Sequence, residues 1–136
     1  MNDPGGTNVR DGLYKFCVST IIEGKKLKQF AAQDWGEASE GKLWKTGKVL
    51  FNDACEIGAR MPVILSDAAY DTSKLLYWGT LRRVDIDGKR TIFRFDDIRR
   101  IRGHSRQELV LKSTGRKIAP HYIRPHAICF TPDFLD

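Results

Sequence analysis

The stretch Leu75–Phe95, LLYWGTLRRVDIDGKRTIFRF, decides the fold of this chain. Two runs rich in aromatic and branched aliphatic residues flank Asp87-Gly88, a dipeptide typical of tight hairpin turns. Gly79 interrupts the first run, and an isolated glycine inside a strand indicates a bulge or a close approach of another backbone. The stretch therefore predicts a β-hairpin whose strands cover Leu75–Val84 and Thr91–Phe95.

Other short apolar runs, on both sides of the hairpin, predict additional strands. Turn residues bound these runs, among them Gly103 and the triplet Thr114-Gly115-Arg116. The expected strands cover Leu13–Thr20, Met61–Ser66 and Glu108–Lys112, and a closing segment covers Ile118–Phe130.

Two segments favour helices instead. Lys25–Ala32 carries apolar residues three positions apart, and Leu43–Ile57 has a rough helical stripe that Gly58 is suited to end. The polar, glycine-containing segment Gly36–Gly41 between them is expected to be a loop.

This order of elements predicts an α+β protein. One strand, two helices and then several closely spaced strands suggest a small, strongly curved sheet or partial barrel with helices at its openings. The 136 residues fit one core. We therefore expect a flexible polar leader over residues 1–12 and a single domain over residues 13–136.

The positive charge of the chain is concentrated in its second half. The net charge is +6; residues 1–77 contain 10 basic and 10 acidic side chains, whereas residues 78–136 contain 13 and 7. Ten of those 13 basic residues are arginines, whose planar guanidinium groups match phosphates and base edges. An ordinary solvated basic face is one interpretation. The asymmetry favours an anionic partner, and we expect nucleic acid, either DNA or RNA.

Three cysteines, Cys17, Cys55 and Cys129, lie far apart in the sequence. Their odd number and their apolar or helical surroundings predict buried free thiols rather than a disulfide framework. The N-terminus lacks the basic and apolar regions of a signal peptide, and no run of about 20 apolar residues could span a bilayer. We therefore expect a cytoplasmic protein that does not engage membranes.

The sequence carries no motif for a metal, a nucleotide or a cofactor. His104, His121 and His126 are not joined by zinc-binding spacings, and neither a P-loop nor a dinucleotide-binding glycine pattern occurs. We expect structural or surface histidines, no metal and no cofactor.

Asp96-Asp97 is the strongest candidate for catalysis, because paired carboxylates beside a basic stretch can hold a divalent ion in a nuclease. However, adjacent residues on a strand face opposite ways, and aspartate is common in turns. We interpret the pair as a turn at the end of a hairpin strand. Since no serine has a convincing base beside it, we expect no enzymatic activity.

Aromatic side chains provide the remaining signal. Trp35, Trp44 and Trp78 occur in a short chain, and aromatic faces can hold an unstacked base at roughly 1–3 kcal/mol per base. Core packing is the competing interpretation for any single tryptophan, and Trp78 is expected to be partly buried. Burial explains Trp35 least, because it lies in the polar segment QDWGE.

The order of several motifs matches a known pattern. A strand opens at Leu13, Trp44 precedes a helix, Met61–Ser66 (MPVILS) ends in a small polar residue, and Leu75–Leu81 (LLYWGTL) holds an aliphatic pair and a glycine. Over roughly residues 13–102 this order resembles the PUA-like superfamily, its EVE branch especially. Gly58-Ala59-Arg60 departs from the Gly-Asp turn usual there, and the block from Ser113 onward has no counterpart.

The resemblance implies a pseudobarrel that binds nucleic acid, often through a modified or flipped base, without chemistry of its own. We predict a module that reads one base in an aromatic cleft between barrel and helices while arginines hold the backbone. The expected pocket residues are Trp35, Trp44, Ser66, Tyr70 and Trp78. The expected backbone-binding residues are Arg82, Arg83, Arg99, Arg100 and Arg102.

Two alternatives remain open. One is a metal-dependent nuclease or base-modifying enzyme that uses Asp96, Asp97 and a histidine. The other is a protein-interaction or regulatory module whose basic face meets an acidic partner.

Overall fold

In a computed structural model, the chain forms one six-stranded sheet with the strand order β2-β5-β4-β3-β1-β6. The structure describes residues 12–41, 44–67, 76–119 and 126–135. Strands β1 and β3 run parallel, whereas every other neighbouring pair is antiparallel. The predicted α+β class is confirmed.

Helices and strands alternate in the first half of the chain, and strands dominate afterwards. The strands are β1 (Phe16–Ile22), β2 (Trp35–Glu40), β3 (Pro62–Asp67), β4 (Leu76–Asp87), β5 (Arg90–Ile101) and β6 (His126–Phe130). The helices are α1 (Gly24–Gln33), α2 (Lys45–Glu56) and the short 3-10 helix η1 (Arg106–Glu108). Both predicted α-helices and the predicted hairpin of β4 and β5 are confirmed. Strand β1 begins later than expected, and Leu13 forms only an isolated bridge with Arg60.

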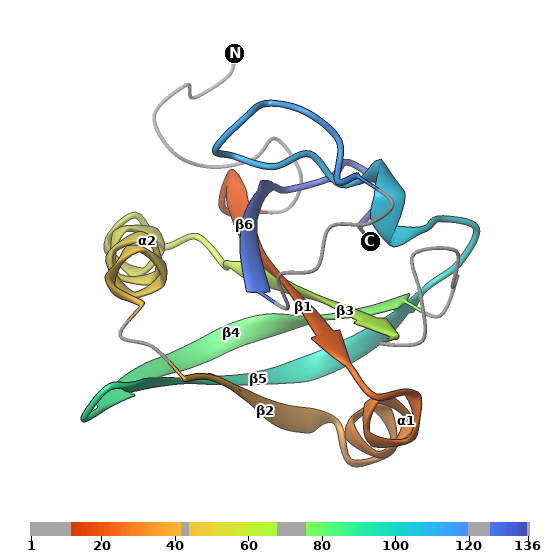
Figure 1. The fold of residues 1–136 in the computed structure, drawn as a ribbon, viewed down its shortest axis with the longest axis horizontal. Coiled ribbons are helices and arrows are strands. Elements are labelled where there is room, and N and C mark those ends of the chain that lie inside the picture. The colour runs from red at the N-terminus through yellow and green to blue at the C-terminus, as the bar shows by residue number, and fades with distance from the viewer. Residues whose placement is uncertain (1–11, 42–43, 68–75, 120–125, 136) are drawn as a thin grey trace.

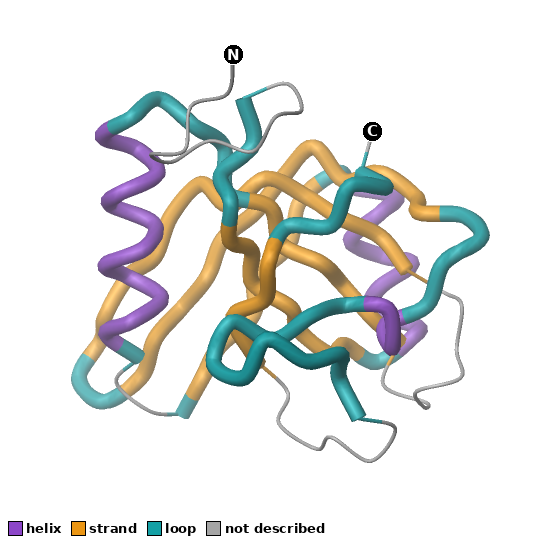
Figure 2. Tube along the Cα trace, turned by 90° about the horizontal axis from the view of Figure 1, so that it is seen from above, coloured by secondary structure: helices purple, strands orange, loops and turns teal. Residues whose placement is uncertain are grey.

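The sheet bends so strongly that β1 crosses over β4 and β5 (Figure 1). Helices α1 and α2 lie at opposite ends of this curved sheet (Figure 2). Its two outermost strands, β2 and β6, do not pair with each other. The curved sheet with flanking helices is therefore as expected, but it is not closed into a barrel.

The inner face of the sheet and the two α-helices enclose the first of two hydrophobic cores. Its large members include Tyr14, Leu27, Phe93 and Phe95, which are almost fully buried. Burying an apolar side chain of this size contributes roughly 1.5–3 kcal/mol. This core therefore holds both helices against the sheet.

A second core lies on the opposite, outer face of the sheet. Ile64, Trp78 and Cys129 belong to it, and Leu109, Ile118 and other residues of the C-terminal segments cover it. Trp78 is only 1% exposed, so it is buried more deeply than expected.

The loop expected over Gly36–Gly41 is wrong, because Trp35–Glu40 forms edge strand β2. Its inward residues are small: a Cβ at Gly36 would lie 2.6 Å from the ring of Phe30 and 2.9 Å from that of Phe95. The apolar alternation that predicts a strand is therefore missing from this sequence.

The apolar residues of β4 face the second core at the start of the strand and the first core towards its end. Two register shifts interrupt its pairing with β5, and the first lies at Gly79. A Cβ at Gly79 would lie 2.9 Å from the backbone carbonyl oxygen of Asp96, so the predicted bulge and close backbone approach are confirmed. The second shift lies between Leu81 and Arg83, and because a bulge shifts the alternation of a strand, Leu81 and Val84 both enter the first core although they lie three positions apart.

The strand expected over Glu108–Lys112 is also wrong. This segment follows η1 and forms only isolated bridges, one of them between Leu111 and Cys129. The amide of Lys112 donates to the carbonyl oxygen of Ile128 over 3.0 Å, so the segment covers the outer edge of β6. The predicted turn over residues 114–116 is present, and of the closing segment predicted over residues 118–130, residues 120–125 lie outside the described residues.

Two of the three cysteines are buried as expected. Cys17 and Cys129 face each other across β1 and β6 and are inaccessible to solvent. Cys55 lies exposed on α2, so its predicted burial is wrong. No helix among the described residues is long and apolar enough to cross a membrane.

Candidate functional site

Trp35, the first residue of β2, is 44% exposed. Its register partner on β5 is Asp96. Phe93 and Phe95 point into the first core, so the alternation of β5 places Arg94 and Asp96 on the outer face of the sheet. Trp35 lies on that face as well, because cross-strand partners share a face.

One arginine lies at the indole ring, and a second lines the same pocket. The guanidinium carbon of Arg94 lies 5.2 Å from the centre of the Trp35 ring, which is cation–π distance. Arg82 reaches the same place from β4, and its Nε donates to Oδ1 of Asp96 over 2.6 Å. An aromatic ring, two guanidinium groups and a carboxylate therefore line the same pocket.

These side chains surround a surface pocket of about 530 Å3, called here the Trp35 pocket. It is lined by Gln33, Asp34, Trp35, Arg82, Arg94, Phe95 and Asp96. The turn that leads into β2 is held on both sides: Gln33 donates to the carbonyl oxygen of Trp35 over 2.8 Å, and Asp34 accepts from the amide of Ile98 over 2.8 Å. These bonds fix the position of Trp35.

Ion pairs balance the charge of this face. They are Arg82–Asp96 at 2.6 Å, Arg83–Asp85 at 2.9 Å and Arg94–Glu37 at 2.8 Å. All three arginine side chains are 49–66% exposed, and an exposed ion pair contributes only about 0–1 kcal/mol. The face is therefore rich in guanidinium donors, and its carboxylates can be replaced by a ligand at small cost.

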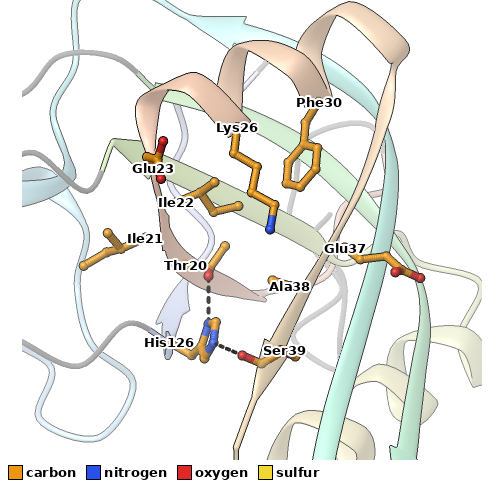
Figure 3. Close-up of a pocket in the computed structure, with 10 residues that line it drawn as sticks. All are labelled: Thr20, Ile21, Ile22, Glu23, Lys26, Phe30, Glu37, Ala38, Ser39 and His126. Atoms are coloured by element: carbon orange, nitrogen blue, oxygen red, sulfur yellow. Dashed lines mark hydrogen bonds between the residues drawn. The ribbon is translucent and has the colours of Figure 1, made fainter.

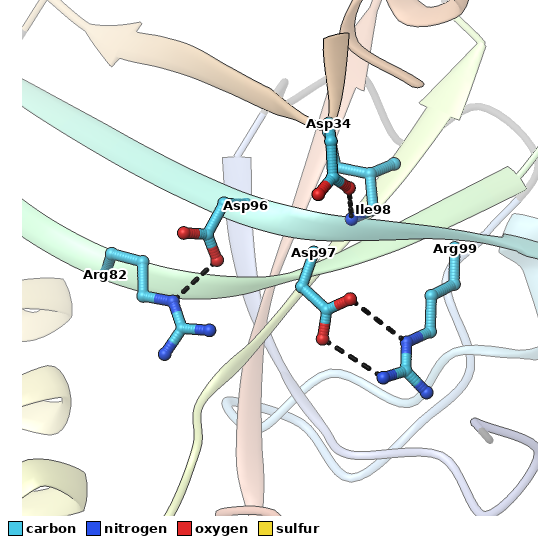
Figure 4. A network of polar contacts seen from close by, with 6 residues as sticks. All are labelled: Asp34, Arg82, Asp96, Asp97, Ile98 and Arg99. Carbon is cyan, nitrogen blue, oxygen red and sulfur yellow. Dashed lines mark hydrogen bonds and ion pairs between the residues drawn. The ribbon is translucent and has the colours of Figure 1, made fainter. Parts of the chain in front are cut away.

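Asp96 and Asp97 do not form a turn at the end of a strand, so that interpretation is wrong. Strand β5 continues through them to Ile101, with Asp97 in the left-handed region at φ 56°. Each carboxylate forms an ion pair with an arginine: Asp96 with Arg82 of β4, and Asp97 with Arg99 (Figure 4). Within the described ranges, no group of three or more His, Cys, Asp and Glu side chains could hold a metal ion.

Trp44 lies far from the Trp35 pocket and is packed on several sides. A Cβ at Gly47 would lie 2.8 Å from its ring, Phe93 meets it edge-on at 5.1 Å, and His126 stacks on it at 6.4 Å. The half-buried ring thus joins α2 to the sheet.

The other predicted pocket residues do not line the Trp35 pocket either. Ser66 and Trp78 are 2% and 1% exposed, and both belong to the interior. Tyr70 lies outside the described residues. The structure therefore does not bring the predicted pocket residues together.

The predicted backbone-binding arginines are all exposed but do not form one surface. Arg82 and Arg83 lie near the Trp35 pocket. Arg99 lies over the ring of Trp78, whereas Arg100 lies over that of Tyr77, which faces the other side of the sheet. Arg102 follows the end of β5.

Arg94 is a pocket residue that the sequence analysis did not single out. It reaches Trp35 only because β2 pairs with β5, and β2 was expected to be a loop. An arginine alternating with Phe93 and Phe95 was the available signal for an outward-facing residue.

A second pocket lies between the two edge strands, β2 and β6 (Figure 3). His126 closes one end of it: Nδ1 lies 2.7 Å from the hydroxyl of Thr20, and Nε2 lies 3.0 Å from the carbonyl oxygen of Ser39. This second pocket has a volume of about 380 Å3, and Lys26 of α1 points into it (Figure 3).

Comparison of the chain with protein-family models, curated proteins and solved structures gave no match. The resemblance to PUA-like domains therefore stays a prediction.

Proposed function

We propose that the protein is a non-enzymatic module that binds single-stranded or locally unpaired nucleic acid on its outer face. One base stacks on Trp35, and the arginines around it donate to the neighbouring phosphates. The observation that carries the proposal is an indole 44% exposed beside two guanidinium groups in one pocket.

Each part of the Trp35 pocket suits a part of a nucleotide. An indole face accepts any base by stacking, at roughly 1–3 kcal/mol per base. A guanidinium has five N–H donors, and Arg82 uses its Nε for Asp96. Other N–H groups of the half-exposed side chain can therefore reach a phosphate without complete loss of the ion pair.

The proposal differs in place from what the PUA-like resemblance implies. That resemblance implies a cleft between barrel and helices, whereas the Trp35 pocket lies on the outer face of β2, β4 and β5. A preference for a modified or flipped base, a cytoplasmic location and the absence of catalysis remain parts of the proposal.

The test is binding of fluorescein-labelled eight-nucleotide RNA and DNA strands, measured by anisotropy over a salt titration. We expect binding that weakens as salt rises, because phosphate contacts release counterions. Trp35→Ala should weaken binding about 5- to 150-fold, since loss of one stacked base costs roughly 1–3 kcal/mol. Phe130→Ala is the matched control, because Phe130 is 43% exposed and lies outside the pocket.

Three results would contradict the proposal: no binding at low salt, binding without a salt dependence, or equal losses in the two variants. Binding of an acidic polypeptide that nucleic acid cannot displace would favour the protein-interaction alternative instead.

A further inference from the structure

We infer that the Trp35 pocket selects guanine among the four bases, with Asp96 as the residue that reads it. The inference rests on the proposed function, because it concerns the base that stacks on Trp35. It goes further by assigning a ligand to the carboxylate and guanidinium groups beside the ring.

Asp96 is placed beside the stacking surface by the sheet itself. It is the register partner of Trp35 across β2 and β5, so the two side chains are neighbours on the outer face. Its side chain is 44% exposed, which leaves it accessible to a base lying on the indole. No movement of the backbone is needed to bring the two together.

Arg82 orients this carboxylate. Its Nε holds Oδ1 of Asp96 at 2.6 Å, and the second carboxylate oxygen points away from the guanidinium (Figure 4). A carboxylate has about four lone-pair sites, so Asp96 can accept from a base while it remains paired. The result is an acceptor pair next to a donor group in the pocket that Trp35 lines.

Among the four bases, only guanine carries the complementary edge. Its N1–H and N2–H2 groups are adjacent donors that match two carboxylate oxygens, and its O6 beside them accepts from a guanidinium. Adenine and uracil alternate donors and acceptors along the same edge, and cytosine has one donor beside two acceptors, so each would set an acceptor against the carboxylate. An unpaired polar edge in a binding site is costly, which is the basis of selection.

The experiment uses oligouridine eight-mers that carry one central guanosine, adenosine, cytidine or inosine, because guanine homopolymers self-associate. We expect the guanosine strand to bind at least tenfold more tightly than the adenosine and cytidine strands. Inosine lacks the N2 amino group and should fall between them. Deoxyribose versions should show the same order, since the sugar plays no part in the inference.

Asp96→Asn replaces one acceptor by a donor and should reduce the guanosine preference to less than threefold. Asp85→Asn is the matched control and should keep the preference. Asp85 also pairs with an arginine, at 2.9 Å, and is 48% exposed, but it lies outside the pocket. The comparison of strands on the unaltered protein decides the inference even where a variant is less stable.

The outcomes separate the two proposals. Equal binding of all strands, weakened by Trp35→Ala, would overturn guanine selection and leave the proposed function standing. Retention of the preference in Asp96→Asn would overturn the role of Asp96. Absence of binding to every strand would overturn both proposals.

Discussion

His126 and Ser39 connect the two outermost strands of the sheet, which do not pair with each other. The imidazole Nε2 of His126 lies 3.0 Å from the backbone carbonyl oxygen of Ser39, and a carbonyl can only accept. Nε2 therefore donates to it, and in the tautomer with a single proton on Nε2, Nδ1 accepts from the hydroxyl of Thr20 at 2.7 Å. One side chain thus holds β6 against β1 and β2.

His126→Ala should destabilise the protein. The hydroxyl of Thr20 is almost fully buried and would lose its partner, which costs about 1–3 kcal/mol. The measurement is the free energy of unfolding in urea. Ser39→Ala is the control, because His126 binds the backbone of Ser39 and not its side chain. A comparable loss of unfolding free energy in both variants would contradict this account of the contact between β6 and β2.

Gly36→Ala should also destabilise the protein, for a different reason. The added methyl group would lie 2.6 Å from Phe30 and 2.9 Å from Phe95, two rings of the first core. Overpacking of this kind costs about 1–3 kcal/mol. Gly41→Ala provides the comparison, since a Cβ there has no neighbour within 4 Å. Urea midpoints that fall equally in both variants would show that Gly36 is not sterically required.

The elements with strong local signals were predictable from the sequence, and those made by long-range contacts were not. Asp87-Gly88 and the runs around it determine a hairpin locally, and Gly79 marks its bulge. Strand β2 has no such signal, because its core-facing residues Gly36 and Ala38 are small and its aromatic residue, Trp35, faces outward. Its position depends on the pairing with β5.

The candidate site also combines a locally predictable feature with long-range contacts that the sequence does not reveal. Exposure of Trp35 could be predicted from its polar neighbours, because no local apolar pattern would bury it. Its association with Arg94 and Asp96 could not, since it requires the β2–β5 register. Arginine content likewise predicted an anionic partner but not the carboxylate that pairs with each arginine of the outer face.

Thiol accessibility should differ sharply among the three cysteines. A disulfide reagent added to the native protein should modify Cys55 rapidly and leave Cys17 and Cys129 intact, because only Cys55 is exposed. Burial also raises the pKa of the Cys129 thiol to about 12, which suppresses the reactive thiolate. Reagent absorbance should therefore report one thiol before denaturation and three after it.

Cys55→Ser is the control for this measurement and should abolish the rapid reaction. Fast modification of two or three thiols in the native protein would contradict the burial of the pair between β1 and β6.

Stability should fall in alkaline solution, partly through Tyr14. Burial raises the pKa of the Tyr14 hydroxyl above its ordinary value of 10, and the hydrogen bond to Asp53 at 2.5 Å and the charge of Asp53 act in the same direction. A group with a raised pKa stabilises the folded state below its unfolded pKa and loses that contribution as the pH rises above 10. Tyr14→Phe cannot ionise, so its free energy of unfolding should decline less between pH 9 and pH 11. Parallel pH profiles for the two proteins would contradict this assignment.

The pairing of β1 with β6 has a consequence for how the protein is made. Thr20 and His126 are partners in this pairing although they lie 106 residues apart. A ribosome adds about 5–20 residues per second, so β1 emerges several seconds before its partner does. Contacts of such long range also slow folding itself, typically to milliseconds or seconds. During that interval the edge of β1 that later pairs with β6 has no partner strand, and the nascent chain is expected to expose this edge until His126 has emerged.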